Sequence, residues 1–396
     1  MLNVAHHTIL LQDGTRCNFK KELLSHKKTL ICVLDAVQDG RGKYGKRHPL
    51  SVMLVLLFSG ITAGSTTLKD CHLWAVHNKQ FLRQFFPLVH GIPDPTTISR
   101  AIQTVDMDSL VHAYLRWQQI VHGKGKTASF DGKTLNGMHG DSMTRHVLSL
   151  FVHDTHQVIG QIGVSQKENE IPAAKRLFRQ VGKQMLSGML LVGDALHTQT
   201  ETAKAITSYD ADYLFVVKGN QEQLLQDLAY LFIDGASFRT SVAREEEYGH
   251  NRYIQSAVTL IDDDYVREYF GTWKKLAYVG RLLRSGTRSE KGVAIPVDET
   301  VYFITSKKDL TAKQAAKHLR MHWSIENNLH WQKDYTFLED RQTLRKGNAP
   351  LVMTFLRSMC ISLFAACSFA SVTTTIANFQ KSPSLHHTFL TSVHIF

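Results

Sequence analysis

The sequence predicts an α/β fold with a helical N-terminal domain, a mixed-sheet core and a β-rich subdomain inserted into that core. Residues 1–120 have mostly helical apolar spacing. From about Lys126, short apolar strands alternate with amphipathic helices, and residues 221–300 then contain mostly strand-like, charged segments. At 396 residues the chain is long enough to bury a large core in two or three structural units.

The N-terminal segment combines a basic, glycine-rich loop with a strongly apolar helix in GKYGKRHPLSVMLVLLFSGITAG, where Pro49 can begin the helix. After a turn at GIPDP, either Thr96 or Thr97 can cap a short helix that carries Arg100. No helix-turn-helix spacing is clear in this segment. Residues 1–120 are therefore either a DNA-binding module or a packing domain.

The core begins in residues 121–220 with the order strand, hairpin, helix, strand, helix, strand. The first strand is TASF, which leads into Asp131, and the hairpin HVLSLFVHDTHQVIGQIGVS turns at Asp154–Gln157. A helix follows in IPAAKRLFRQV, then the strand GMLLVGDA, the helix QTETAKAITSY and the strand DYLFVVKGN. This is the order of a ribonuclease-H-like core.

The final helix of the core is delayed by the insertion at residues 221–300. Helical spacing resumes in TAKQAAKHLRMHWSIENNLHW, within residues 301–370, and an apolar helix begins near Pro350. Residues 371–396 are rich in Ser and Thr and weakly patterned, so we expect this tail to be loose.

The composition indicates which kind of binding partner and which cellular compartment to expect. The formal net charge of +11 favours a partner rich in phosphate, and no acidic residue follows Asp340. The five cysteines include no Cys-x-x-Cys pair, which argues against a disulfide framework or a zinc ribbon and favours a reducing compartment. The apolar stretch from Val352 to Val372 contains Arg357, which favours a buried helix over a membrane span. We therefore expect a cytoplasmic protein without a membrane segment.

Three acidic residues stand in frames that suit metal chemistry. Asp131 follows an apolar strand in SFDGKTL, Asp194 ends another in LLVGDALHTQ, and Glu326 lies in the helical segment HWSIENNLHW. Carboxylates that converge on rigid elements can hold two Mg²⁺ or Mn²⁺ ions for phosphodiester chemistry. Plainer interpretations also exist, because Asp-Gly is usually a turn and Asp194 can cap the next helix.

Two further patterns suggest other sites. Gly132–Thr134 resembles the end of a phosphate-binding loop, but Thr127 stands where that motif needs a glycine, which excludes this kind of nucleotide site. His322, Glu326 and His330 are spaced four apart and can share one helical face. A zinc site is therefore an alternative, although neither the His-Glu-x-x-His motif nor nearby cysteine ligands support it.

Several motifs together resemble the DDE transposases of the ISAs type, bacterial insertion-sequence enzymes that include the H-repeat-associated proteins. These motifs are DGKT, QKENEIPAAKRLF, GDALHTQ, DYLFVVKGNQ, KHLRMHWSIENNLHW and FLEDR, in the order and approximate spacing of that group. GKRHPLSVMLVLLFSGITAG and GIPDPTTISR resemble the domain that precedes its catalytic core. The resemblance covers roughly residues 30–365.

The resemblance implies that Asp131, Asp194 and Glu326 are a metal-binding catalytic triad that acts with two Mg²⁺ or Mn²⁺ ions. It implies cut-and-paste transposition on terminal inverted repeats, and a homodimer that spans two element ends. The chain departs from the wider group at Leu319 and His322, which stand where Tyr and Arg are usual. Asn136 also replaces a frequent Arg, and the tail after about residue 369 differs from the usual family ending.

Basic residues near these motifs are expected to contact DNA phosphates, namely Lys133, Lys218, Arg320 and Lys333. Lys333 follows Glu326 by two α-helical turns, so the two should lie on about the same face. Trp273, in the insertion, can stack on an unpaired base at a cleaved end, as an aromatic residue of related enzymes does, although core packing is the more common role for such a residue.

The predicted function is metal-dependent cleavage of double-stranded DNA at the ends of an insertion sequence, followed by joining of the freed 3′-hydroxyl to target DNA. The protein would then be cytoplasmic and associated with the nucleoid. The alternative is a catalytically inactive relative that binds DNA as a repressor.

Overall fold

The computed structural model describes residues 6–10, 16–20, 30–42, 44, 46–121, 125–135, 144–165, 168–234, 238–249, 252–290, 293–367, 369, 371–393 and 395. The chain forms two compact units, and each is described by itself. Unit 1 consists of Met1–Lys124, Gly132–Asn169 and Glu326–Phe396, and unit 2 of Gly125–Asp131 and Glu170–Ile325. Asn136, one of the departures from the family pattern, lies outside the described residues.

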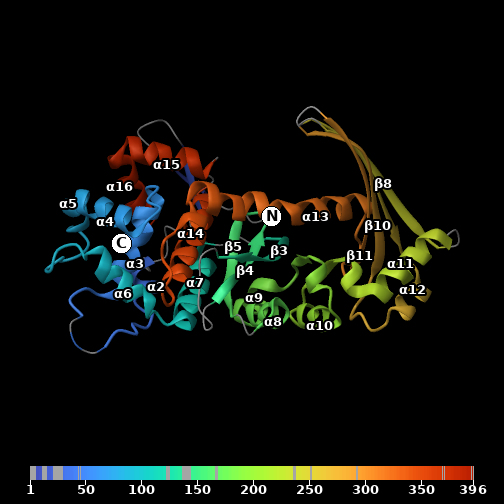
Figure 1. Cartoon of the computed structure of the whole chain (residues 1–396), viewed down its shortest axis with the longest axis horizontal. Coiled ribbons are helices and arrows are strands. Elements are labelled where there is room, and N and C mark those ends of the chain that lie inside the picture. The colour runs from blue at the N-terminus through green and yellow to red at the C-terminus, as the bar shows by residue number, and fades with distance from the viewer. Residues whose placement is uncertain are drawn as a thin grey trace. The chain divides into compact units, whose positions relative to one another are not determined.

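The N-terminal part of unit 1 is mostly helical (Figure 1). A short hairpin of β1 (His6–Leu10) and β2 (Arg16–Lys20) is followed, in the residues that the structure describes, by a series of helices. These helices are α2 (Leu30–Leu34), α3 (Leu50–Thr62), α4 (Leu68–His77), α5 (Lys79–Leu82), α6 (Pro95–Gln103) and α7 (Met107–Val121).

Local sequence explains where these helices begin. Pro49 precedes α3, as expected from its fixed φ. The predicted cap of α6 is wrong by two or three residues, because the cap is Asp94, and not Thr96 or Thr97, and its side chain accepts the backbone N–H of Thr96. The Asp94 carboxylate also accepts the Thr96 hydroxyl, so the threonine supports the cap without being it.

The longest apolar helix of unit 1 is α14 (Ala349–Ala366). It is long and apolar enough to cross a membrane, but 89% of it is buried inside the protein, where it packs on α3, α7 and strand β5. Strands β4 (Thr144–Val152) and β5 (Gln157–Ser165) form the predicted hairpin, and Ser362 of α14 accepts the Val158 backbone N–H at 3.0 Å. Helix α14 therefore has the environment of a core helix.

The expectation of a loose tail is wrong, because residues 371–396 contain α15 (Val372–Lys381) and α16 (Pro383–Ser392). Ser371 and Ser382 cap the two helices with their side chains. The rings of Phe379 and Phe389 pack against each other and against Phe364 of α14. The serine and threonine content conceals these widely spaced aromatic residues, which provide the apolar face.

Unit 2 is built around strands of one mixed sheet whose full order is β5-β4-β3-β6-β7-β11-β10-β9-β8. Strands β3 (Thr127–Thr134), β6 (Leu190–Gly193) and β7 (Asp212–Val217) are parallel to one another. The inserted strands then continue the sheet, since β11 pairs antiparallel with β7. They are β8 (Thr240–Gly249), β9 (Arg252–Ile261), β10 (Tyr278–Glu290) and β11 (Val293–Thr305).

The helices of unit 2 are α8 (Glu170–Val181), α9 (Lys183–Leu186), α10 (Thr200–Ser208), α11 (Glu222–Asp234), α12 (Asp264–Tyr269) and α13 (Ala312–Ile325), with short turns η1 (Ala195–His197) and η2 (Gly219–Gln221). Helix α13 packs on the sheet through Ala312, Ala315, Ala316 and Leu319. The small alanine side chains permit close approach of the helix to the strands. The mixed sheet, the helical N-terminal region and the β-rich insertion confirm the predicted fold class.

Candidate metal centre

Asp131 and Asp194 stand at matching positions on neighbouring parallel strands. In the pairing of β3 with β6, Phe130 lies opposite Gly193, so each aspartate directly follows this pair. Gly193 is required here by packing, because a Cβ at this position would lie 2.7 Å from the Phe130 ring. Both aspartates therefore stand level with the C-terminal end of β6, the end of parallel strands at which α/β proteins commonly bind ligands, although β3 continues to Thr134.

His322 of α13 interacts electrostatically with both aspartates. It is 8% exposed, and its Nδ1 lies 3.3 Å from Oγ of Ser129, two residues before Asp131. Burial lowers the pKa of His322, while the negative charges of Asp131 and Asp194 oppose that shift. His322 is therefore mostly neutral near pH 7 and adds little positive charge beside the carboxylates.

The segment that follows α13 is π-helical rather than α-helical. The two π-helical turns are η3 (Glu326–His330) and η4 (Gln332–Thr336), after which the short turn η5 (Glu339–Arg341) leads toward α14. A π-helix has i→i+5 hydrogen bonds and wider turns, and it is found frequently at functional sites. In these wider turns, residues that would share a face of an α-helix no longer do so, which changes the predicted position of Lys333 relative to Glu326.

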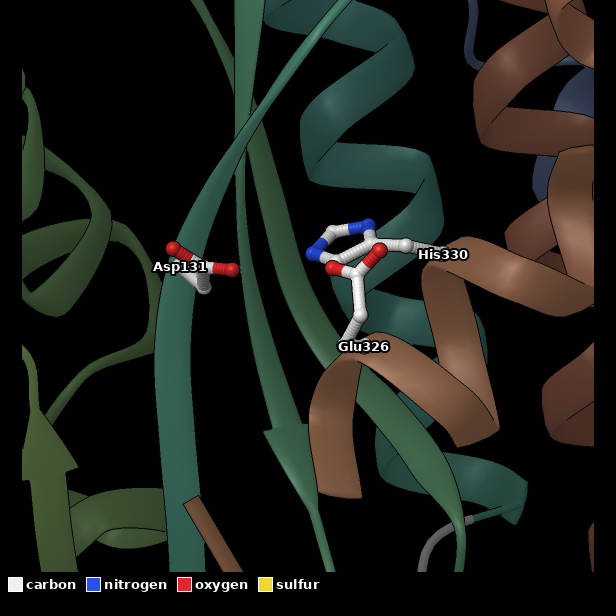
Figure 2. A group of neighbouring side chains, drawn as sticks. All are labelled: Asp131, Glu326 and His330. Carbon is white, nitrogen blue, oxygen red and sulfur yellow. The ribbon is translucent and has the colours of Figure 1, made fainter. Parts of the chain in front are cut away.

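Asp131, Glu326 and His330 form a group that can hold a cation. One ligand atom from each lies within 4.8 Å of the others. Figure 2 shows Asp131 on its strand, with the Glu326 carboxylate and the His330 ring on the helical segment facing it. Two carboxylates and one imidazole offer two hard oxygen donors and one nitrogen donor, a set that suits Mn²⁺ and, with water in place of nitrogen, Mg²⁺.

Asp194 is not a member of that group in the part of the chain that the structure describes. It is the N-cap of η1, and its Oδ1 accepts the His197 backbone N–H at 3.4 Å. This is the capping role that the sequence offered as its plainer interpretation. Its negative charge, like that of Asp131, nevertheless acts on the pKa of His322 and opposes the lowering by burial.

The zinc alternative grouped His322 with Glu326 and His330, but the structure groups Asp131 with the latter two. The alternative assumed an α-helix, in which residues spaced by four share a face. Glu326 and His330 do lie together, whereas His322, on α13, lies with its Nδ1 3.3 Å from Oγ of Ser129 and is not part of the group. The sequence did not predict His330 as a metal ligand together with Asp131.

Lys333 does not lie on an exposed face with Glu326, because its side chain is buried while Glu326 is exposed. Burial lowers the pKa of Lys333 to about 8, and the nearby Glu339 carboxylate opposes that shift. Lys133 is also engaged, since its Nζ lies 2.7 Å from Asp334 and 3.3 Å from Asp340. Both lysines thus have acidic neighbours in this structure.

The other residues predicted to contact DNA differ in how exposed their side chains are to solvent. Lys218, which precedes η2, is exposed. Arg320 is exposed on α13 and pairs with Glu245 of β8. Trp273 is only 6% exposed, which supports core packing over base stacking.

A strand-borne aspartate, Asp131, in one ligand group with a helix-borne glutamate, Glu326, is an arrangement expected of a DDE transposase core, and the chain belongs to that class. The family model described as "Transposase DDE domain" matches residues 96–363, and the model "DDE_Tnp_1-associated" matches residues 31–118.

Individual relatives are found in Escherichia coli. The "Putative transposase YncI" of strain O157:H7 is 29% identical over 357 residues, which cover 86% of this chain and 88% of the relative. The "H repeat-associated putative transposase YhhI" of strain K12 is 28% identical over 347 residues, covering 85% and 90%. The predicted resemblance to the H-repeat-associated group is confirmed.

Proposed function

We propose that this protein is a cut-and-paste transposase that cleaves DNA at terminal inverted repeats and transfers the freed strand to target DNA. Asp131, Asp194 and Glu326 are its proposed catalytic residues. The observation that carries the proposal is the position of Asp131, which follows the same strand pair as Asp194 and lies in one ligand group with Glu326.

The donor set fits two divalent cations of the Mg²⁺ or Mn²⁺ type. The oxygens of Asp131 and Glu326 are hard ligands, and the carboxylate of Asp194 can supply a further one. When bound, such ions would lower the pKa of an attacking hydroxyl or water and stabilise the charge on the leaving oxygen.

The chain's own groups prepare the site in three ways. The β3–β6 pairing fixes the backbone of the two aspartates, so their carboxylates need little reorganisation. The buried His322 is largely neutral, so it does not compete with a cation for the two carboxylates. Helix α13, packed on the sheet, leads directly into Glu326 and limits where that carboxylate can go.

DNA would be held by exposed cations outside the ligand group. Lys218 and Arg320 are directly accessible, and a phosphate could replace Glu245 as the partner of Arg320. Lys133 could exchange Asp334 and Asp340 for phosphate oxygens. We further propose that the protein acts in the cytoplasm, at the nucleoid, and as a homodimer that brings two element ends together.

The test is a cleavage assay on a labelled DNA fragment that carries the element's inverted repeat, with Mg²⁺ or Mn²⁺. Asp131→Asn, Asp194→Asn and Glu326→Gln should each abolish strand cleavage while binding to the end DNA is retained. Glu201→Gln is the matched control, because Glu201 is an exposed carboxylate of unit 2 that pairs with Lys204. Cleavage that persists in one variant would remove that residue from the triad.

The same assay separates the alternative function. A wild-type chain that binds the inverted repeat but cleaves with neither metal would be a DNA-binding relative without catalysis. Binding is measured on the same fragment by mobility shift, so the two outcomes are distinguishable.

A further inference from the structure

A cavity of about 300 Å³ in unit 2 is lined mainly by residues of α11 and α12. Figure 1 shows these two helices at the same end of the inserted strands. It is lined by Asp227, Tyr230 and Leu231 of α11, by Phe238, and by Tyr265, Val266 and Tyr269 of α12. Its volume is at the lower end of the range for ligand sites. Four aromatic rings around one carboxylate are an unusual lining for a surface pocket.

The aromatic side chains of this cavity are open to solvent. Tyr230, Tyr265 and Tyr269 are 67%, 65% and 57% exposed. The rings of Tyr265 and Tyr269 are four residues apart on α12 and lie nearly parallel, with centroids 6.5 Å apart. Exposed tyrosines grouped around a pocket are typical of recognition sites, because they supply contact area at low entropic cost.

The charge of the cavity is negative. Asp227 lies among the rings, and its charge, followed by desolvation and a hydrogen bond to the carboxylate, raises the pKa of Tyr269. Helix α11 carries the acidic residues Glu222, Asp227 and Asp234 and contains no Lys or Arg. Such a surface repels a phosphate backbone and attracts a cation.

Aromatic faces beside a carboxylate are the chemistry that binds a guanidinium or an ammonium group. Helix α11 already shows this preference on another of its residues, since the Arg281 guanidinium lies 5.0 Å from the centre of the Phe232 ring. The cavity offers further rings, Tyr230 of α11 with Tyr265 and Tyr269 of α12, beside the Asp227 carboxylate, which accepts a hydrogen bond from Gln223 at 2.8 Å.

We propose that this cavity is a cage for a cationic side chain from a second copy of this chain. The segment proposed for it, on charge complementarity, is residues 40–48, GRGKYGKRH, which contains Arg41, Lys43, Lys46 and Arg47 and no acidic residue. Asp39 pairs with Arg41 and Lys46, and Arg47 is exposed. Two reciprocal contacts of this kind would make a closed dimer.

The direct test uses a fluorescent peptide of residues 40–48 and the full-length protein, with binding followed by anisotropy. Asp227→Asn and Tyr269→Leu should each weaken peptide binding by roughly fivefold to thirtyfold. Glu222→Gln should leave it unchanged, because Glu222 lies on the same helix outside the cavity. Circular dichroism of each variant checks that the fold is retained.

A second peptide, with its four Lys and Arg residues replaced by Gln, should not bind. Equal binding of both peptides, or equal affinity of wild type and Asp227→Asn for the basic peptide, would overturn the proposal. Binding of a single-stranded oligonucleotide that depends on Tyr265 and Tyr269 would overturn it too, by showing that the rings serve nucleic acid.

The test in the intact protein is sedimentation velocity. Asp227→Lys and Arg47→Asp should each reduce self-association, and the double variant should restore it by exchanging the charges. The proposal does not depend on metal chemistry, so a chain without cleavage activity can still pass this test. Self-association that neither single variant changes would refute the role of a second copy.

Discussion

Arg357 and Glu339 form an ion pair inside unit 1, with Nη1 of Arg357 3.2 Å from Oε1 of Glu339 and both side chains 1% exposed. Arg357 also donates to Gln342 and to the carbonyl of Thr66, and Thr354 donates to Glu339. Burial alone would raise the pKa of Glu339, but the charges of Lys333 and Arg357 outweigh it and lower that pKa. The arginine in the apolar helix α14 is thus explained.

Breaking this pair should destabilise the protein strongly. Glu339→Gln leaves the Arg357 charge buried without its carboxylate, and we expect a loss of about 3–5 kcal/mol in the free energy of unfolding. Urea denaturation measures the loss. Glu201→Gln, an exposed control, should change the value by less than about 0.5 kcal/mol. A loss from Glu339→Gln no larger than the control's would show that the pair is not structural.

The buried Lys333 should make stability depend on pH in the alkaline range. Its pKa is about 8 when folded, below its ordinary value of 10.5. Between these values the unfolded chain binds the extra proton, so the contribution of Lys333 to stability rises with pH, by up to roughly 3 kcal/mol. Below pH 8 both states are protonated, and the cost of burying the charge is fully present.

The measurement is the difference in unfolding free energy between wild type and Lys333→Met at pH 7 and at pH 10. The difference should move in favour of wild type as the pH rises. Lys204→Met, at an exposed position, should show no such trend. A flat difference for Lys333→Met would mean that the lysine is not buried as a charge.

Metal binding should stabilise the fold if the ligand group is real. Mn²⁺ should raise the melting temperature of wild type, because an ion that binds only the folded state adds to its stability. Asp131→Asn and Glu326→Gln should lose this increase, and His330→Gln should reduce the Mn²⁺ effect more than the Mg²⁺ effect. Equal increases in wild type and Asp131→Asn would place the ion elsewhere.

The C-terminal helices should contribute to the core. Phe389→Ala should lower the unfolding free energy by about 3–5 kcal/mol, because the ring packs against Phe364 and Phe379. Thr388→Ala is the neighbouring control, since Thr388 is exposed on the same helix. Similar, small effects of both substitutions would support a loose tail after all.

The close packing of Gly193 against the Phe130 ring, next to the two aspartates, should matter for activity. Gly193→Ala forces the Phe130 ring, which is fully buried, away from β6. We expect a cleavage rate reduced at least tenfold with DNA binding retained, since Phe130 directly precedes Asp131. Gly188→Ala tests the alternative that any glycine in this region is sensitive. Gly188 has no atom within 4 Å of an added Cβ, so its substitution meets only backbone strain. An unchanged rate in Gly193→Ala would show that the ring can move freely.

Patterns in the sequence predicted the strands β3 and β6 and the positions of Asp131 and Asp194 on or after them, because these depend on local order, whereas the catalytic role of the two aspartates stays a proposal. An apolar run that ends in Asp gives the strand and the position of the carboxylate together, as at Leu190–Gly193 followed by Asp194. The environment of Lys333 was not predictable in the same way. Its expected face assumed α-helical spacing from Glu326, whereas the segment is π-helical, and its burial depends on Glu339 and Arg357.

The other errors have similar causes. The helix α6 begins one residue after Asp94, at Pro95, so the turn GIPDP already contains its cap. The tail was expected to be loose because its polar composition hides the spacing of its aromatic residues. In both cases the structure depends on specific side-chain contacts, the Asp94 cap and the packing of the tail aromatics, which residue composition does not reveal.

The π-helical stretch from Glu326 to Thr336 makes the length of this segment more critical than its composition. Removing a single amino acid there would let the wide turns tighten to ordinary pitch and rotate every later side chain about the axis. Glu326 would keep its place on the incoming helix while Lys333 swung away from Glu339. Insertions and deletions in this stretch should therefore be far more harmful than substitutions at its solvent-facing positions, such as Trp331 or Tyr335.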